Sequence, residues 1–151
     1  MHIEINQRSH LERFIALNQA WISHYFVLED SDKKLAENPY AIVDNGGCIL
    51  SLVDEGNVVA VCALFRDSEH CYQLARMAVD TQVRGKGYGN FLMQAVIAKA
   101  KELGATSLFL HSNTKLEAAI ALYRKHGFTT KSEGQHPLYA RSNIVMELQI
   151  Q

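Results

Sequence analysis

The sequence predicts an α/β fold in which a mixed, mostly antiparallel sheet of six to seven strands carries helices on both faces. Three observations lead to this fold class. Two apolar runs flank a turn-forming segment at 55–57, as in a β-hairpin. Amphipathic helical patterns then alternate with short apolar runs, which is typical of parallel connections. Because no linker or internal repeat divides the chain, residues 1–151 are expected to form a single domain.

The composition is that of an ordinary globular protein, with 48% hydrophobic and 21% charged residues. Fifteen basic and sixteen acidic residues give a formal net charge of -1, so we expect neither nucleic acid nor a membrane as a partner. The cysteines Cys48, Cys62 and Cys71 lack metal-ligand spacing, and no metal site is expected. The start has no signal-peptide pattern, which predicts a cytoplasmic protein.

The first forty residues are expected to hold one short strand and two helices. Alternating apolar residues predict a strand at 3–5, and Ser9 is expected to cap a helix with one apolar face that extends to Trp21. A second helix is expected at 32–37. Pro39 disfavours helical geometry at the preceding residue, so this helix should end there.

The remainder of the chain is expected to supply most of the sheet. Glycines near position 46 predict a turn before the first of these strands, and the glycine in 55–57 predicts a turn between the first and the second. A glycine-rich segment separates the third strand from a long helix, which Gly104 ends. The expected strands lie at 48–53, 58–65, 71–79, 107–111, just after 128, and 144–150, and the expected helices lie at 89–103 and 116–126.

The glycine-rich segment at 84–89 reads Arg-Gly-Lys-Gly-Tyr-Gly and precedes the long helix. Glycines allow positive φ and close approach of backbone N–H groups to an anion, and a helix amino terminus adds positive potential. We therefore expect this segment to bind a diphosphate. The alternative is that the glycines are needed only for tight packing between the strand and the helix. A P-loop would need Ser or Thr after Lys86, but Gly87 stands there.

Residues 73–79, followed by the pattern Arg84-x-x-Gly87-x-Gly89, resemble the acyl-CoA motif of the GNAT (GCN5-related) N-acetyltransferase superfamily. Downstream, residues 108–113 and 118–128 resemble the second conserved segment of that superfamily. The resemblance extends over about 48–150. It implies a sheet that splays between its fourth and fifth strands, with acetyl-CoA as the acyl donor. Homodimers are common in this superfamily, so a homodimer is one option.

The resemblance also implies which residues bind the donor. Backbone groups of the fourth strand would pair with the pantetheine arm, while amides of the glycine-rich segment would hold the pyrophosphate. Asn113 would contact the pantetheine or orient the end of the fifth strand. The implied acetyl-CoA-binding residues are Met77, Ala78, Val79, Arg84, Gly85, Lys86, Gly87, Tyr88, Gly89 and Asn113.

Acyl transfer needs a neutral amine, an oxyanion donor and a proton for the leaving thiolate. The resemblance places Tyr123 near the thioester as the general acid, and the alternative is a core tyrosine. It also places Gln73 where relatives commonly carry a glutamate that acts as the catalytic base. The Gln73 side chain cannot accept a proton. His111 on the next strand could relay the proton, or could be an ordinary strand-end histidine. A main-chain N–H near Val79 would stabilise the oxyanion.

The expected acceptor is the primary amine of a small molecule, such as an amino acid. A segment with Tyr139 and Arg141 is similar to one in a bacterial GNAT subgroup, and an arginine suits a carboxylate, although a solvated loop is the alternative. His24 could line the acceptor pocket. Two other functions stay open, namely a catalytically weak acyl-CoA-binding sensor or partner module, and acetylation of protein amino termini or lysines.

Overall fold

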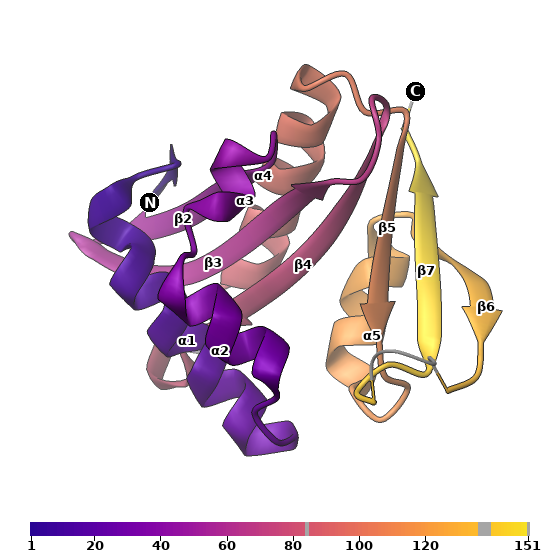
Figure 1. Cartoon of the computed structure of the whole chain (residues 1–151), viewed down its shortest axis with the longest axis horizontal. Helices are drawn as coiled ribbons and strands as arrows, with labels where there is room; N and C mark the ends of the chain where they lie inside the picture. The colour runs from indigo at the N-terminus through magenta and orange to yellow at the C-terminus, as the bar shows by residue number, and fades with distance from the viewer. Residues whose placement is uncertain (84, 136–139, 151) are drawn as a thin grey trace.

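The computed structural model describes residues 1–83, 85–135 and 140–150. Its seven strands form one mixed sheet in the order β1-β2-β3-β4-β5-β7-β6 (Figure 1). The predicted α/β sheet of six to seven strands is confirmed. The strands are β1 (His2–Ile5), β2 (Cys48–Asp54), β3 (Asn57–Arg66), β4 (Cys71–Val79), β5 (Ser107–Ser112), β6 (Thr129–Glu133) and β7 (Ile144–Gln149).

The helices agree with the expected ones in the second half and differ in the first. They are η1 (Arg8–His10), α1 (Leu11–Tyr25), α2 (Asp30–Glu37), α3 (Ala41–Asp44), η2 (Thr81–Val83), α4 (Tyr88–Glu102) and α5 (Glu117–Lys125). Ser9 does not cap α1, because it lies inside η1 and His10 precedes the helix without a side-chain cap. The short α3 was not predicted. None of the described helices is long and apolar enough to cross a membrane.

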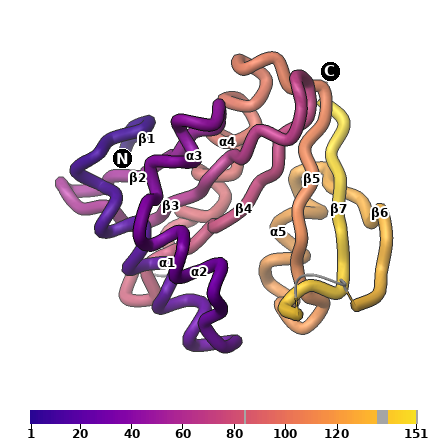
Figure 2. Tube along the Cα trace, viewed as in Figure 1, coloured from indigo at the N-terminus to yellow at the C-terminus, as the bar shows by residue number. Residues whose placement is uncertain are grey.

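Helices cover both faces of the sheet, as Figures 1 and 2 show. On one face, Phe14 and Leu17 of α1 pack with Ile42 of α3 against inward residues of β2 and β3. On the other face, α4 contributes buried residues that include Leu92 and Val96. Burying each such side chain contributes about 1.5–3 kcal/mol, so the two apolar layers fix the helices on the sheet.

Strands β4 and β5 diverge after a short parallel pairing. Only residues Cys71, Tyr72 and Gln73 pair with β5, although β4 continues to Val79 along β3. β5 instead continues beside β7, with which it pairs along all six of its residues. Figures 1 and 2 both show the separation of the two strands. The predicted splay is therefore confirmed, and it places the ends of β4 and β5 on opposite sides of an opening.

A β-bulge interrupts β4 where it borders this opening. The register moves from Ala63–Ala75 to Val61–Ala78, so two β4 residues, Arg76 and Met77, lie opposite one residue of β3. Arg76 has φ of 58°. A non-glycine residue in this region costs on the order of 1–3 kcal/mol, so its surroundings must hold it there.

Asn18 of α1 holds the bulge. Its side chain is buried, and its Nδ2 donates to the carbonyl oxygen of Arg76 at 3.1 Å and to that of Phe14 at 3.0 Å. A buried carbonyl without a donor would cost about 1–3 kcal/mol. Helix α1 therefore fixes the irregular backbone of β4 through a single amide group.

Candidate active site

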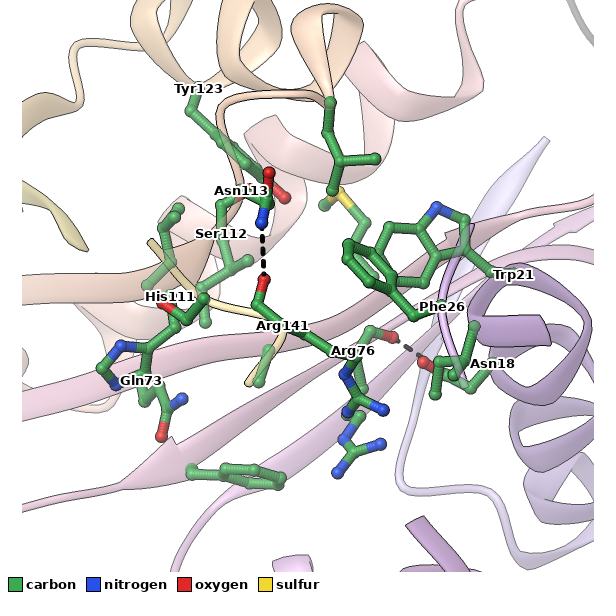
Figure 3. Close-up of a pocket in the computed structure, with 18 residues that line it drawn as sticks. Asn18, Trp21, Phe26, Gln73, Arg76, His111, Ser112, Asn113, Tyr123 and Arg141 are labelled. Carbon is green, nitrogen blue, oxygen red and sulfur yellow. Dashed lines mark hydrogen bonds between the residues drawn. The ribbon is translucent and has the colours of Figure 1, made fainter. Parts of the chain in front are cut away.

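A cavity of about 220 Å³ opens between the diverging ends of β4 and β5. This volume is below the range of about 300–1,000 Å³ that is common for drug-sized ligands, so the cavity suits a small one. Its walls come from α1, β3, β4, β5, α5 and the segment before β7 (Figure 3). The lining includes Asn18, Trp21, Phe26, Phe65, Gln73, Arg76, Met77, His111, Ser112, Asn113, Leu116, Tyr123 and Arg141.

Gln73 and His111 both line the cavity, and Figure 3 shows them near each other on β4 and β5. Gln73 lies opposite Phe109 in the last parallel pair. His111 is two residues farther along β5, and its ring contacts that of Phe109 at 5.7 Å between centroids. The structure thus places Gln73, which was predicted to stand where relatives carry a glutamate base, near His111, which was predicted as an alternative proton relay.

Tyr123 of α5 faces the same cavity from the other side of the opening (Figure 3). Its ring also packs on Phe128, with 6.0 Å between centroids. Burial raises the pKa of the Tyr123 phenol above its ordinary value. The hydroxyl therefore stays protonated at neutral pH, as a proton donor must.

The described residues of the glycine-rich segment, 85–89, lead into α4 and lie outside the cavity lining. Gly85 and Gly87 have φ of 79° and 74°, so the expected need for positive φ is confirmed at both positions. Gly87 immediately precedes the first turn of α4, whose N–H groups lack acceptors within the helix. Arg84 lies outside the described residues, and the Lys86 side chain is exposed.

Two contacts fix the amino terminus of α4. The Tyr88 hydroxyl donates to the Asp54 carboxylate at the end of β2, and this hydrogen bond raises the pKa of Tyr88 to about 12. A Cβ atom added at Gly89 would lie 3.4 Å from the Leu122 side chain, an ordinary van der Waals distance, so Leu122 of α5 packs beside the first turn of α4. These contacts hold the helix end at which a diphosphate was predicted to bind.

Of the other residues that were predicted to bind acetyl-CoA, some line the cavity and some do not. Met77 lines the cavity, whereas Ala78 and Val79 do not. The irregular backbone lies at Arg76 and Met77, before the position near Val79 where an oxyanion donor was expected. The side chain of Asn113 donates to the carbonyl of Arg141 at 3.2 Å and accepts from the N–H of Lys115 at 3.0 Å. Asn113 therefore links the residue after β5 to the segment before β7, and it also lines the cavity.

On the acceptor side, Arg141 lines the cavity as expected. His24 does not line it: its side chain is exposed and packs on Tyr25, with 4.6 Å between the ring centroids. Trp21 and Phe26 form this part of the wall instead. Tyr139 lies outside the described residues.

Sequence reasoning missed an ion cluster beside the cavity. The Asp32 side chain is 2% exposed and binds two arginines, Arg76 through Nη1 at 2.5 Å and Arg141 through Nη1 at 2.6 Å and Nη2 at 2.9 Å. Burial alone would raise the pKa of Asp32, but hydrogen bonds from Arg141, the Glu29 backbone and Arg76 hold it well below 3.8. An acidic residue in the first turn of a helix was the available signal, but capping alone could explain it.

The family model described as the acetyltransferase (GNAT) family matches residues 12–128. The chain belongs to this family. The GNAT prediction is thereby confirmed.

Among relatives of this GNAT chain, N-acetylaspartate synthetase from Danio rerio is 33% identical over 95 residues, which are 62% of the chain and 34% of that protein. Amino-acid acetyltransferase from Neisseria meningitidis serogroup B is 33% identical over 87 residues, which are 57% of the chain and 19% of that protein. The chain thus spans about a third or less of the length of these curated relatives.

Solved structures show the same fold. A GNAT-family acetyltransferase from Staphylococcus aureus superimposes with a TM-score of 0.85 at 22% identity, covering 99% of this chain and all of the other. An acetyltransferase from Salmonella typhimurium, solved with acetyl-CoA, gives 0.77 at 20% identity and covers 100% and 94%. The splayed seven-stranded sheet is therefore the GNAT fold.

Proposed function

We propose that this GNAT protein transfers an acetyl group from acetyl-CoA to the primary amine of a small molecule of the amino-acid class. The observation that carries this proposal is the cavity at the β4–β5 splay, which brings Tyr123 to the same space as the β4 bulge. Family membership supports acetyl transfer, and the acetyl-CoA in the Salmonella structure supports the donor.

The donor would lie across the opening with its pantetheine arm between β4 and β5. The β4 segment from Met77 to Val79 has lost β5 as a neighbour, so a ligand amide can pair with its backbone as another strand would. The pyrophosphate would contact the N–H groups between Gly85 and Gly89. Two glycines with positive φ and the amino terminus of the fifteen-residue α4 favour an anion there.

In the proposed reaction, the acceptor nitrogen attacks the thioester carbon directly within a ternary complex, and the C–S bond then breaks. Tyr123 would give its proton to the departing thiolate. A main-chain N–H at the bulge near Met77 would stabilise the oxyanion. The amine must first lose its own proton, and His111 would accept it through water because Gln73 has no basic group.

An acceptor of the amino-acid class is supported by two independent points. The names of the relatives, N-acetylaspartate synthetase and amino-acid acetyltransferase, refer to amino acids. The residues that line the cavity also include Arg76 and Arg141, and guanidinium groups suit a carboxylate.

Gln73 favours a second candidate function. If no glutamate stands at this position and His111 does not act as the base, the protein would bind acyl-CoA without efficient turnover. The protein would then be an acyl-CoA-binding sensor or partner module.

Thiol release from acetyl-CoA, measured with amino acids, polyamines and aminoglycosides, separates these functions. The enzyme proposal expects release that depends on one acceptor class, with an N-acetylated product of the expected mass. Tight CoA binding without release across the whole panel would support the module instead.

A second experiment tests His111 as the base, because His111→Ala should remove the acidic limb of the pH–rate profile. An unchanged limb would exclude His111 from this role.

A further inference from the structure

The charged side chains that line the cavity among the described residues are all arginines. Arg76 and Arg141 line it, and no described aspartate or glutamate does. Asp32 lies behind them, and its carboxylate accepts from both guanidinium groups and from the N–H of Glu29 at 2.8 Å. The Glu29 carboxylate is 3.6 Å from Arg141 Nη1, but its side chain is 35% exposed, so water screens its charge.

The two arginines differ in how many donors remain for a ligand. Arg141 gives two N–H groups to Asp32 in a bidentate pair. In the part of the chain that the structure describes, the Arg76 guanidinium donates one hydrogen bond, from Nη1 to Asp32. A guanidinium has five N–H donors, and Arg76 lines the cavity at the bulge, with its side chain next to that of Arg141 (Figure 3). Arg76 is therefore the better placed of the two to bind a carboxylate.

The same cavity has an aromatic wall. Trp21, Phe26 and Phe65 line it. Phe26 is held in place by Lys115, whose Nζ lies 4.0 Å from the ring centroid and donates to the carbonyl of Tyr25 at 3.1 Å. This wall suits an apolar group of the acceptor, since aromatic side chains bury large apolar area.

We infer that the acceptor is an amino acid with an apolar or aromatic side chain, that Arg76 binds its carboxylate, and that Asp32 positions Arg76 for this contact. The inference rests on the proposed function and narrows its substrate class. A carboxylate on Arg76 would direct the neighbouring amine along β4 toward the thioester. A second ammonium group, as in a polyamine, would meet two guanidinium groups and be repelled. An amine without a carboxylate would lack the contact with Arg76.

Binding can be measured without turnover, because Trp21 is the only tryptophan of the chain and lines the cavity. Its fluorescence is titrated with leucine, leucinamide, aspartate and spermidine in the presence of CoA. Leucine should bind about tenfold or more tightly than leucinamide, the value expected for losing one charged hydrogen bond. Spermidine should bind more weakly than leucine because its ammonium groups meet the arginines, and aspartate should do so because its side-chain carboxylate would lie against the aromatic wall.

Variants assign the effect to Arg76. Arg76→Gln should bind leucine and leucinamide equally, and Arg76→Lys, which keeps the charge next to Asp32, should retain part of the preference. Arg124→Gln is the control, because Arg124 lies outside the cavity and donates to Thr130; it should behave as the wild type.

Equal binding of leucine and leucinamide by the wild type would overturn the inference, as would tighter binding of aspartate or spermidine. A leucine preference that survives in Arg76→Gln would overturn the role of Arg76. These outcomes differ from a failure of the proposed function, which would appear as selective amino-acid binding without any thiol release.

Discussion

At the scale of single residues, the proposed chemistry depends most on Tyr123. Tyr123→Phe removes the proposed proton donor but keeps the ring that packs on Phe128, so turnover should fall about a hundredfold with little change in CoA affinity. Burial raises the pKa of this phenol, and a raised pKa keeps it protonated as the pH rises to its ordinary value of 10. Loss of kcat between pH 8 and about 10 should therefore not come from Tyr123. Thiol release across this range measures both effects, and unchanged turnover in Tyr123→Phe would remove its role as the acid.

Asn18 is the residue on which the geometry of the bulge depends. In Asn18→Ala the carbonyl of Arg76 loses its donor, so the free energy of unfolding should fall by about 1–3 kcal/mol. Turnover should fall as well, because Arg76 and Met77 lose their fixed position. Urea unfolding and thiol release measure the two effects. The control is Asn57→Ala at the exposed start of β3, which should change neither. Full activity in a destabilised Asn18→Ala would show that the bulge has no catalytic part.

Sequence patterns predicted some of these residues and not others. Gln73, His111, Tyr123 and Arg141 were found because they belong to, or follow, motifs of contiguous residues. Asn18, Arg76 and Asp32 gain their roles from contacts between distant segments, such as the Asp32–Arg141 pair, which is 109 residues apart in sequence. Asn18 did leave a signal, since it is a polar residue four positions from Phe14 on the apolar face of α1.

At the scale of elements, the passage from α3 into β2 depends on Gly47. A Cβ atom there would lie 2.1 Å from the carbonyl oxygen of Leu64 and 2.9 Å from that of Ile42, and backbone atoms cannot turn away. Gly47→Ala should lower the free energy of unfolding by about 3 kcal/mol or more. Gly56→Ala is the control: its Cβ meets nothing within 4 Å, so only the positive φ costs about 1–2 kcal/mol. Denaturant titration measures the free energy of unfolding of both variants. Equal losses of this free energy would contradict the role assigned to Gly47.

Long elements were predictable because their apolar periodicity spans several turns or a whole strand. The strands of the β2–β3 hairpin and the helix α4 match their predicted positions to within one or two residues. Short elements were not predictable, since η1 and α3 contain only three and four residues. Too few side chains then remain to show a period. The bulge in β4 shifts the alternation by one residue, since Tyr72 and Leu74 share an apolar layer with Met77 and Val79, but a single shift within nine residues was too short a signal to predict it.

At the scale of the whole molecule, Asp32 joins α2 to β4 and to the segment before β7, and so links the two sides of the cavity. Asp32→Asn leaves two partly buried arginines without their counter-charge, which should cost about 3–5 kcal/mol of stability. The folded-state pKa lies below 3.8, so this stabilisation is present above about pH 4 and is lost as the pH falls further. Unfolding of wild type and Asp32→Asn from pH 7 to 3 checks this. A stability difference that stays constant down to pH 3 would contradict it.

The proposed function requires the opening between β4 and β5 to receive the acetyl thioester. A crystal structure of the protein with acetyl-CoA would locate the donor. The pantetheine arm should lie between β4 and β5, with the thioester in the cavity beside Tyr123 and Met77 and the pyrophosphate against the backbone of Gly85 to Gly89. A pyrophosphate elsewhere, or a thioester outside this cavity, would exclude this mode of binding.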